Sequence, residues 1–108
     1  MIRYLDSLYL TEAASAKVDK FKRNVRLGIG MVGLYVITVS SGEQDVFDIY
    51  PVTLFKQRSF RKRNYDVVGF AESEEAAFKL VQNIYEEYVL KNHTYSGMRA
   101  YFVSQFPS

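Results

Sequence analysis

Two short apolar runs constrain the fold of this chain most. They are LYVITVSS at 34–41 and VVGFA at 67–71. Both are rich in β-branched and aromatic residues, and neither alternates between apolar and polar positions. A strand that is apolar on both faces is typical of a parallel or mixed sheet that helices cover on both sides. We therefore predict an α/β fold in which these two strands are buried.

Two other segments have the periodicity of amphipathic helices. The first, 12–27, follows Thr11, a residue type that caps helix N-termini, and ends before Gly28, which suits the left-handed residue after a helix. The second, 74–91, follows Ser73 and places two glutamates in its first turn, where the helix dipole favours anions. Apolar residues recur along both at the helical period, which predicts one buried face on each.

The remaining segments give weaker signals. Pro51 predicts a short helix before Tyr50 and another that begins at the proline. A connection of this length containing helix favours a right-handed crossover between parallel strands. We also expect a short helix in the tail 97–106 and a short extra strand at 7–10. The whole is predicted to be a single α/β domain, 1–108, in the order α-β-α-β-α, with a small, mostly parallel sheet packed by helices.

The segment GIGMVG at 28–33 matches the letters of the dinucleotide fingerprint G-x-G-x-x-G. That fingerprint binds a pyrophosphate where it follows a strand and opens a helix, whose N-terminus receives the anion. Here the order is reversed, because a predicted helix ends at Gly28 and a predicted strand begins at Leu34. We interpret the segment as a helix C-cap followed by a turn, and we predict no cofactor.

Composition excludes several kinds of site. The chain has no cysteine, which rules out disulfides, thiolate metal ligands and a cysteine nucleophile. His93 is the only histidine, so we predict no metal site and no catalytic constellation. The longest apolar run, 31–39, is far shorter than the about 20 residues that a membrane-spanning helix needs. The first residues do not form a signal peptide, and we expect a cytoplasmic protein with no membrane partner.

Positive charge is concentrated in two stretches, 17–26 and 56–63, which hold ten of the fourteen Lys and Arg residues and one acid, Asp19. Elsewhere four positive residues face eleven negative ones, so the net charge of +2 hides a dipolar distribution. The candidate contacts for nucleic acid or an acidic partner are Lys20, Arg23, Arg26, Lys56, Arg58, Arg61, Lys62 and Arg63. Nucleic acid would use these cations with Phe60 and Tyr65 stacking on bases. The other interpretations are self-association of basic and acidic faces, or ordinary solvated surface.

The ends of the two predicted strands form a second candidate site. In open α/β sheets, ligands bind outside the carboxyl ends of the strands. Residues at or near those ends are Ser40, Ser41, Asp48, Glu72 and Ser73, and we expect any ligand crevice to lie there. A small enzyme built around Ser40, Asp48, Glu72 or His93 would require a pocket that joins at least two of them.

Four stretches, LYVITVSS, FDIY, KQRSF and YDVVGFAESEEAAFKLVQNIYEEY, carry a resemblance to a family of small bacterial α/β proteins of unknown function. The resemblance covers residues 4–104 approximately. It implies an α/β fold and supplies no catalytic residues.

The nine tyrosines and eight phenylalanines are more than a small core readily hides, and exposed aromatic side chains are typical of protein interfaces. Our leading hypothesis is a non-enzymatic intracellular binding protein that self-associates, for example as a homodimer, or docks a protein partner. The alternative is a nucleic-acid-binding protein that uses the basic stretches 17–26 and 56–63.

Overall fold

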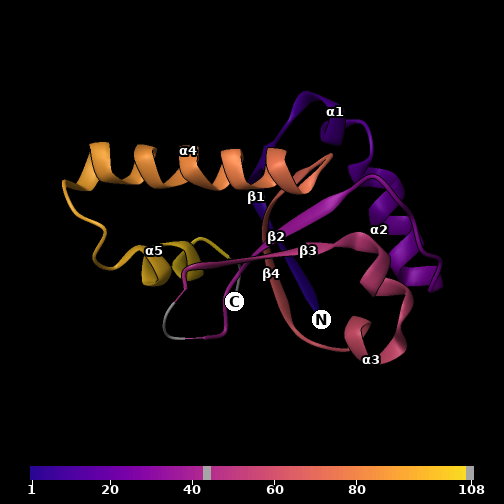
Figure 1. Ribbon diagram of the computed structural model, residues 1–108. Coiled ribbons are helices and arrows are strands. Elements are labelled where there is room, and N and C mark those ends of the chain that lie inside the picture. The colour runs from indigo at the N-terminus through magenta and orange to yellow at the C-terminus, as the bar shows by residue number, and fades with distance from the viewer. Residues whose placement is uncertain (43–44, 107–108) are drawn as a thin grey trace.

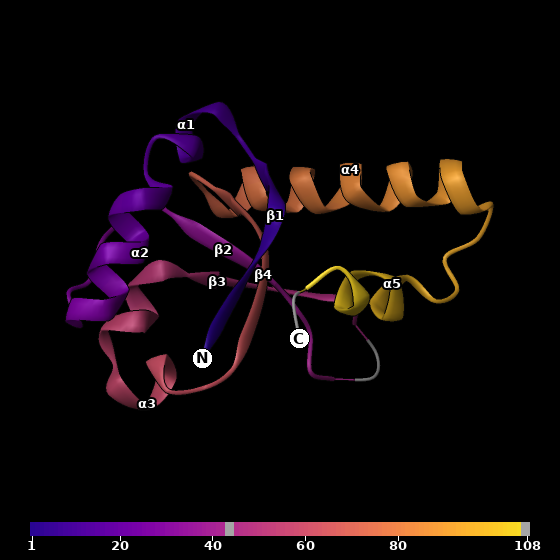
Figure 2. The same cartoon turned by 180° about the vertical axis from the view of Figure 1, so that it is seen from behind.

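A four-stranded mixed sheet lies in the middle of the molecule, in a computed structural model that describes residues 1–42 and 45–106. Helices cover both faces of the sheet, with α4 and α5 on one side and α1, α2 and α3 on the other (Figures 1 and 2). Its strands, in the spatial order β1-β4-β2-β3, are β1 Ile2–Leu10, β2 Tyr35–Val39, β3 Phe47–Pro51 and β4 Tyr65–Ala71. The α/β class and both central strands, β2 and β4, are as the sequence predicts.

The directions of the strands differ from the prediction. Only β1 and β4 are parallel, whereas β2 runs antiparallel to both β4 and β3. The sheet is therefore not mostly parallel, and the predicted crossover between β2 and β4 was wrong. The cause is β3, which pairs with β2 over its whole length, from Tyr35 with Pro51 to Val39 with Phe47. The helix expected before Tyr50 is this strand.

The first strand is longer than predicted and adds an element at the start of the order. Residues 7–10 are the end of a nine-residue strand, and the register between β1 and β4 shifts between Tyr4 and Tyr9. Gly69 lies opposite Tyr9 at this irregularity. A Cβ on Gly69 would lie 2.3 Å from the Tyr9 carbonyl oxygen, so only glycine allows the two backbones to approach this closely. The observed order begins with β1 and includes β3, which replaces the predicted α-β-α-β-α.

The predicted helix 12–27 is divided into α1 Glu12–Ser15 and α2 Val18–Leu27. Thr11 caps α1, as predicted, since its hydroxyl oxygen accepts from the Ala14 N–H at 3.2 Å. Gly28 ends α2 in the left-handed conformation at φ 71°, which confirms its predicted role as a helix stop.

Four more helical elements follow, close to the three positions that the sequence predicts. After Pro51 come a 3-10 helix, η1 Val52–Lys56, and a short helix, α3 Arg58–Arg61. The long helix α4 Glu74–Asn92 begins at its predicted cap, where the Ser73 hydroxyl accepts from Ala76 N–H, and ends at His93 in the left-handed conformation. The tail forms α5 Met98–Ser104, close to the predicted short helix.

The strand side chains divide into two cores, one on each face of the sheet. Ile37 and Val68 pack beneath α4 and α5, whereas Val36, Val67 and Phe70 pack beneath α1, α2, η1 and α3. Adjacent residues of β2 and β4 thus enter opposite cores, which follows from the alternation of side chains along a strand. This arrangement explains why both strands are apolar at successive positions.

Candidate functional site

The glycine segment, residues 28–33, lies against both basic stretches. A Cβ on Gly28 would lie 3.2 Å from the guanidinium carbon of Arg61, and one on Gly30 would lie 3.4 Å from the Lys56 side chain. At the other end of the segment, Lys17 Nζ donates to the Gly33 carbonyl oxygen at 3.1 Å. Residues from 17–26 and 56–63 therefore meet across a turn, although they are distant in sequence.

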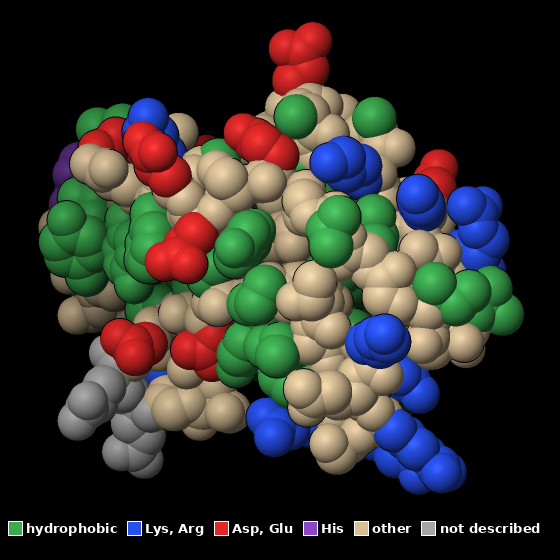
Figure 3. All heavy atoms as spheres, turned by 45° about the vertical axis from the view of Figure 1, so that its right-hand side comes forward, with side chains coloured by type: hydrophobic (Ala, Val, Ile, Leu, Met, Phe, Trp, Pro, Cys, Tyr) green, Lys and Arg blue, Asp and Glu red, His purple; other side chains and the backbone are tan. Residues whose placement is uncertain are grey.

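The cations of the two stretches form no ion pair with any carboxylate in the part of the chain that the structure describes. Lys and Arg side chains gather toward the right and lower part of the molecule in Figure 3, and acidic side chains are more frequent toward its left. Seven of the eight candidate contacts are exposed: Lys20, Arg23, Arg26, Lys56, Arg58, Lys62 and Arg63.

Arg61 and Arg63 also take part in interactions within the chain. Arg61 is half-buried and donates from one guanidinium nitrogen to the carbonyl oxygens of Phe55 and Lys56, at 3.1 and 2.7 Å. It therefore ties α3 to the end of η1. The guanidinium carbon of Arg63 lies 5.2 Å from the ring centroid of Phe60, within the range of a cation–π contact.

Phe60 and Tyr65 do not have the role that the nucleic-acid hypothesis gave them. Their exposed fractions are 7% and 6%, and the Tyr65 hydroxyl donates to the Phe60 carbonyl oxygen at 2.7 Å. Both rings pack against Phe55, at centroid distances of 5.0 and 5.1 Å. The prediction that they are available to stack on bases was wrong, because Phe60 on α3 and Tyr65 at the start of β4 both pack into the core.

Exposed aliphatic side chains interrupt this cationic region. Leu27, Ile29 and Val32 are 64%, 53% and 79% exposed. The sequence analysis gave them no role, because it took Leu27 as the end of a helix and GIGMVG as a turn. The sequence does carry a signal for these exposed residues. Turns on the surface are rich in polar residues, whereas three of the four non-glycine residues at 27–32 are branched aliphatic residues.

A surface hollow of about 540 Å³ lies between α2 and the glycine segment. Its lining residues include Lys17, Lys20, Asn24, Ile29, Met31 and Val32. Asn24 is 8% exposed, which is low for a polar residue. Its backbone carbonyl accepts from the Ile29 N–H at 3.0 Å, and this bond folds the glycine segment back over α2.

The predicted crevice at the strand ends is not one site. Because β2 and β4 are antiparallel, the end of β4 lies beside the start of β2, with Ala71 opposite Tyr35. Ser40 and Ser41 line one hollow, whereas Glu72 and Ser73 line another. Asp48 lies within β3, where its carboxylate accepts from the Tyr50 hydroxyl at 3.2 Å.

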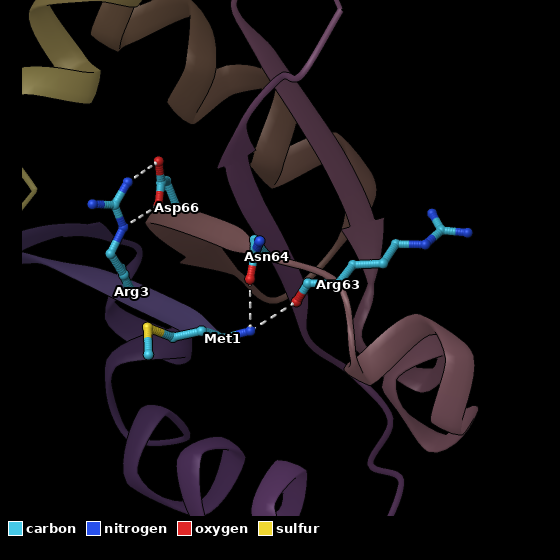
Figure 4. Close-up of polar contacts among 5 residues, drawn as sticks. All are labelled: Met1, Arg3, Arg63, Asn64 and Asp66. Carbon is cyan, nitrogen blue, oxygen red and sulfur yellow. Dashed lines mark hydrogen bonds and ion pairs between the residues drawn. The ribbon is translucent and has the colours of Figure 1, made fainter.

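The polar groups of the first of these hollows satisfy one another (Figure 4). Arg3 donates to both carboxylate oxygens of Asp66 at 2.7 Å, and this partner raises the pKa of the guanidinium. The amino group of Met1 donates to the Arg63 carbonyl oxygen and to Asn64 Oδ1, at 3.2 and 3.0 Å.

The second hollow is lined by helix caps. Thr11 donates its hydroxyl proton to the Glu72 carboxylate, which lowers the pKa of that group, and accepts from the first turn of α1. The Ser73 hydroxyl oxygen accepts a hydrogen bond from the Ala76 N–H in the first turn of α4, at 3.1 Å. These contacts account for Thr11 and Ser73 as the caps of two helices, and for Glu72 as the acceptor of the Thr11 hydroxyl.

No group of three or more metal-ligating side chains gathers within residues 1–42 and 45–106. In the same ranges, none of the helices combines the length and the apolar character that a bilayer crossing requires. Comparison with known proteins found no match to this chain among protein-family models, curated proteins or solved structures. The resemblance to small bacterial α/β proteins therefore stays a prediction.

Proposed function

We propose that this chain is a protein-binding module that docks an acidic segment of a partner protein. The docking surface, called here the basic–apolar surface, consists of the exposed residues on α2, the glycine segment, η1 and α3. Its members are Lys20, Arg23, Arg26, Leu27, Ile29, Val32, Lys56, Arg58 and Lys62. The observation that carries the proposal is the position of three exposed aliphatic side chains among cations that no described carboxylate neutralises.

The mixture of side chains supports a protein partner over nucleic acid. Protein interfaces combine an apolar centre with charged residues around it, and complementary charge steers the encounter and fixes the register. Single-stranded nucleic acids bind cationic grooves through phosphate contacts and aromatic stacking. The two aromatic residues that the nucleic-acid hypothesis uses, Phe60 and Tyr65, are buried, whereas Leu27, Ile29 and Val32 are exposed apolar groups of this surface.

Self-association is the second candidate, and the far end of α4 favours it. Glu86, Glu87, Leu90 and Tyr95 are exposed there, and the two glutamates outnumber the exposed Lys91, so that end is weakly acidic and opposite in charge to the basic–apolar surface. A contact between the two ends of different copies would be head-to-tail and would extend into rings or filaments. Sedimentation of the purified chain over a range of concentrations tests this candidate, because growth beyond a dimer would support it.

The proposal is tested with a short fluorescent peptide rich in glutamate and leucine. We expect micromolar binding that weakens about tenfold, or 1.4 kcal/mol, in the double variant Arg23→Glu/Arg58→Glu. The matched control is Lys79→Glu/Lys91→Glu, which changes the net charge equally on α4 and should bind as the unchanged chain does. An oligothymidylate that binds while the peptide does not would replace the proposal with the nucleic-acid alternative.

A further inference from the structure

We infer that the hollow between α2 and the glycine segment binds the C-terminal carboxylate of a partner chain that ends in an aliphatic residue. The inference rests on the proposed function, because it names the group of the acidic partner that enters the basic–apolar surface. Three independent features of the hollow support it: an unpartnered asparagine, two lysines, and a length of backbone without hydrogen-bond partners.

Asn24 is the first feature. The residue is more than nine-tenths buried, yet its side-chain amide makes no hydrogen bond to any residue in 1–42 or 45–106. Its polar atoms are not fully buried, because among the described residues only Arg99 Nε is a fully buried side-chain atom without a hydrogen-bond partner. The Asn24 amide therefore keeps some contact with solvent, and the residue lines the hollow. A ligand in the hollow could therefore become the hydrogen-bond partner that this amide does not have within the described residues.

The lysines set the charge of the ligand. Lys17, Lys20 and Asn24 lie three and four residues apart along one side of α2, so all three face the same hollow. Lys17 uses one of its three protons on the Gly33 carbonyl, and Lys20 has no described partner. Two ammonium groups beside an amide donor favour an anion with several acceptor positions, and a carboxylate has that chemistry.

The unpaired backbone N–H groups of the glycine segment favour the C-terminal carboxylate of a chain over a side-chain carboxylate. The N–H groups of Gly30, Met31 and Val32 donate to no backbone carbonyl in the described part of the chain, and all three residues line the hollow. Runs of unpaired backbone N–H groups are a recurrent means of capturing a C-terminal carboxylate. Ile29 and Val32 supply apolar contacts for an aliphatic side chain on the same terminal residue.

The test compares one glutamate- and leucine-containing peptide that ends in leucine with its C-terminally amidated form. We expect amidation to weaken binding at least about tenfold, because it removes the negative charge that receives the hydrogen bonds from the lysines and the backbone N–H groups. The variant Asn24→Leu should remove the difference between the two peptides. The control Asn83→Leu changes an exposed asparagine on α4 and should preserve it.

Stability separates a binding role of Asn24 from a structural one. Because the Asn24 amide has no protein partner, Asn24→Leu should leave the melting temperature unchanged or raise it. A fall in the melting temperature of Asn24→Leu would contradict the inference. On the unchanged chain, titration with N-acetyl-leucine should shift the NMR signals of the Asn24 side-chain amide and of Gly30 N–H, which provides a readout that needs no variant.

The outcomes of the two proposals are distinguishable. If both peptides bind equally and Arg23→Glu/Arg58→Glu weakens both, the proposed function stands and the terminal-carboxylate site is overturned in favour of side-chain carboxylates. If N-acetyl-leucine shifts Asn24 and Gly30 while neither peptide binds, the carboxylate site stands and the protein-docking function is overturned. If no probe binds or shifts these signals, both are overturned.

Discussion

The two helical layers that cover the sheet are built in opposite ways. On one face, α4 is a single helix of 19 residues with a side-chain cap at Ser73 and a left-handed stop at His93. On the other face, α1, α2, η1 and α3 are pieces of four to ten residues. Isolated helices this short are unstable in water, so the second layer depends on its packing for its structure. The difference shows where a binding surface can arise, because the joints between short pieces expose backbone and side chains that a long helix satisfies internally.

The core beneath the short pieces compensates with aromatic packing. Phe21, Phe55 and Phe70 are at most 2% exposed, and Phe55 contacts both Phe21 and Phe60 with centroid distances of 5.4 and 5.0 Å. Edge-on aromatic pairs of this kind add stabilisation beyond their buried area. The short elements are thus held from beneath, while their outer surface carries the cations and the exposed aliphatic residues.

Removing the aromatic centre of the short-helix layer should have the largest effect. Phe55→Ala is expected to lower the free energy of unfolding by about 4 kcal/mol, because it leaves a cavity against Phe21 and Phe60. Urea unfolding measures the change. Phe78→Ala on α4 is the matched control, since that ring is 58% exposed and should change stability by less than about 0.5 kcal/mol. Equal losses in the two variants would contradict the contrast between the layers.

A change in the shared sheet should damage both layers together. Gly69→Ala places a methyl group against the Tyr9 carbonyl oxygen, and we expect a loss of about 3 kcal/mol with bent pairing of β1 and β4. Hydrogen exchange should then accelerate beneath both layers. The control Gly42→Ala adds a Cβ in ordinary contact with Ser40, at 3.5 Å, and should be nearly neutral. Acceleration confined to one layer would show that the two cores unfold separately.

The two helix caps provide a finer comparison between the layers. Thr11→Ala and Ser73→Ala should each cost about 1 kcal/mol through the lost cap. Thr11→Ala should cost more at neutral pH, because the Thr11 hydroxyl also lowers the pKa of Glu72. A lowered carboxyl pKa stabilises the fold above the unfolded pKa, and this contribution disappears as the pH falls through the folded value. The excess cost of Thr11→Ala over Ser73→Ala should therefore vanish in acid, as thermal unfolding across pH would measure.

The smallest effect concerns tyrosine ionisation at the edge of the short-helix layer. Burial raises the pKa of Tyr4 from 10.0 to about 12, with a smaller opposing effect of Arg26. A raised pKa means that the neutral phenol is favoured in the folded state, so stability is unaffected below pH 10 and falls as the pH rises toward 12. Tyr4→Phe should make the decline in stability above pH 10 shallower without changing neutral stability by more than a small amount. An unchanged alkaline decline would show that other tyrosines dominate it.

Local signals in the sequence determined several parts of this protein. The buried strands β2 and β4, the helix α4 between Ser73 and His93, and the stop at Gly28 all follow from residues within a few positions of each element. Periodicity and capping act at short range, which is why these elements were predictable. The segregation of charge into 17–26 and 56–63 is likewise a property of the sequence.

The tertiary structure alone decided how these elements pair and what meets at the surface. Five residues, 47–51, are too few for the sequence to distinguish a strand from a turn of helix. Their antiparallel pairing with β2 makes them a strand, and β4 then runs antiparallel to β2 instead of parallel to it. That reversal separated Ser40 from Glu72 and ended the predicted crevice. The hollow at Asn24 likewise depends on the folding of the glycine segment over α2, a contact between surfaces that no local pattern records.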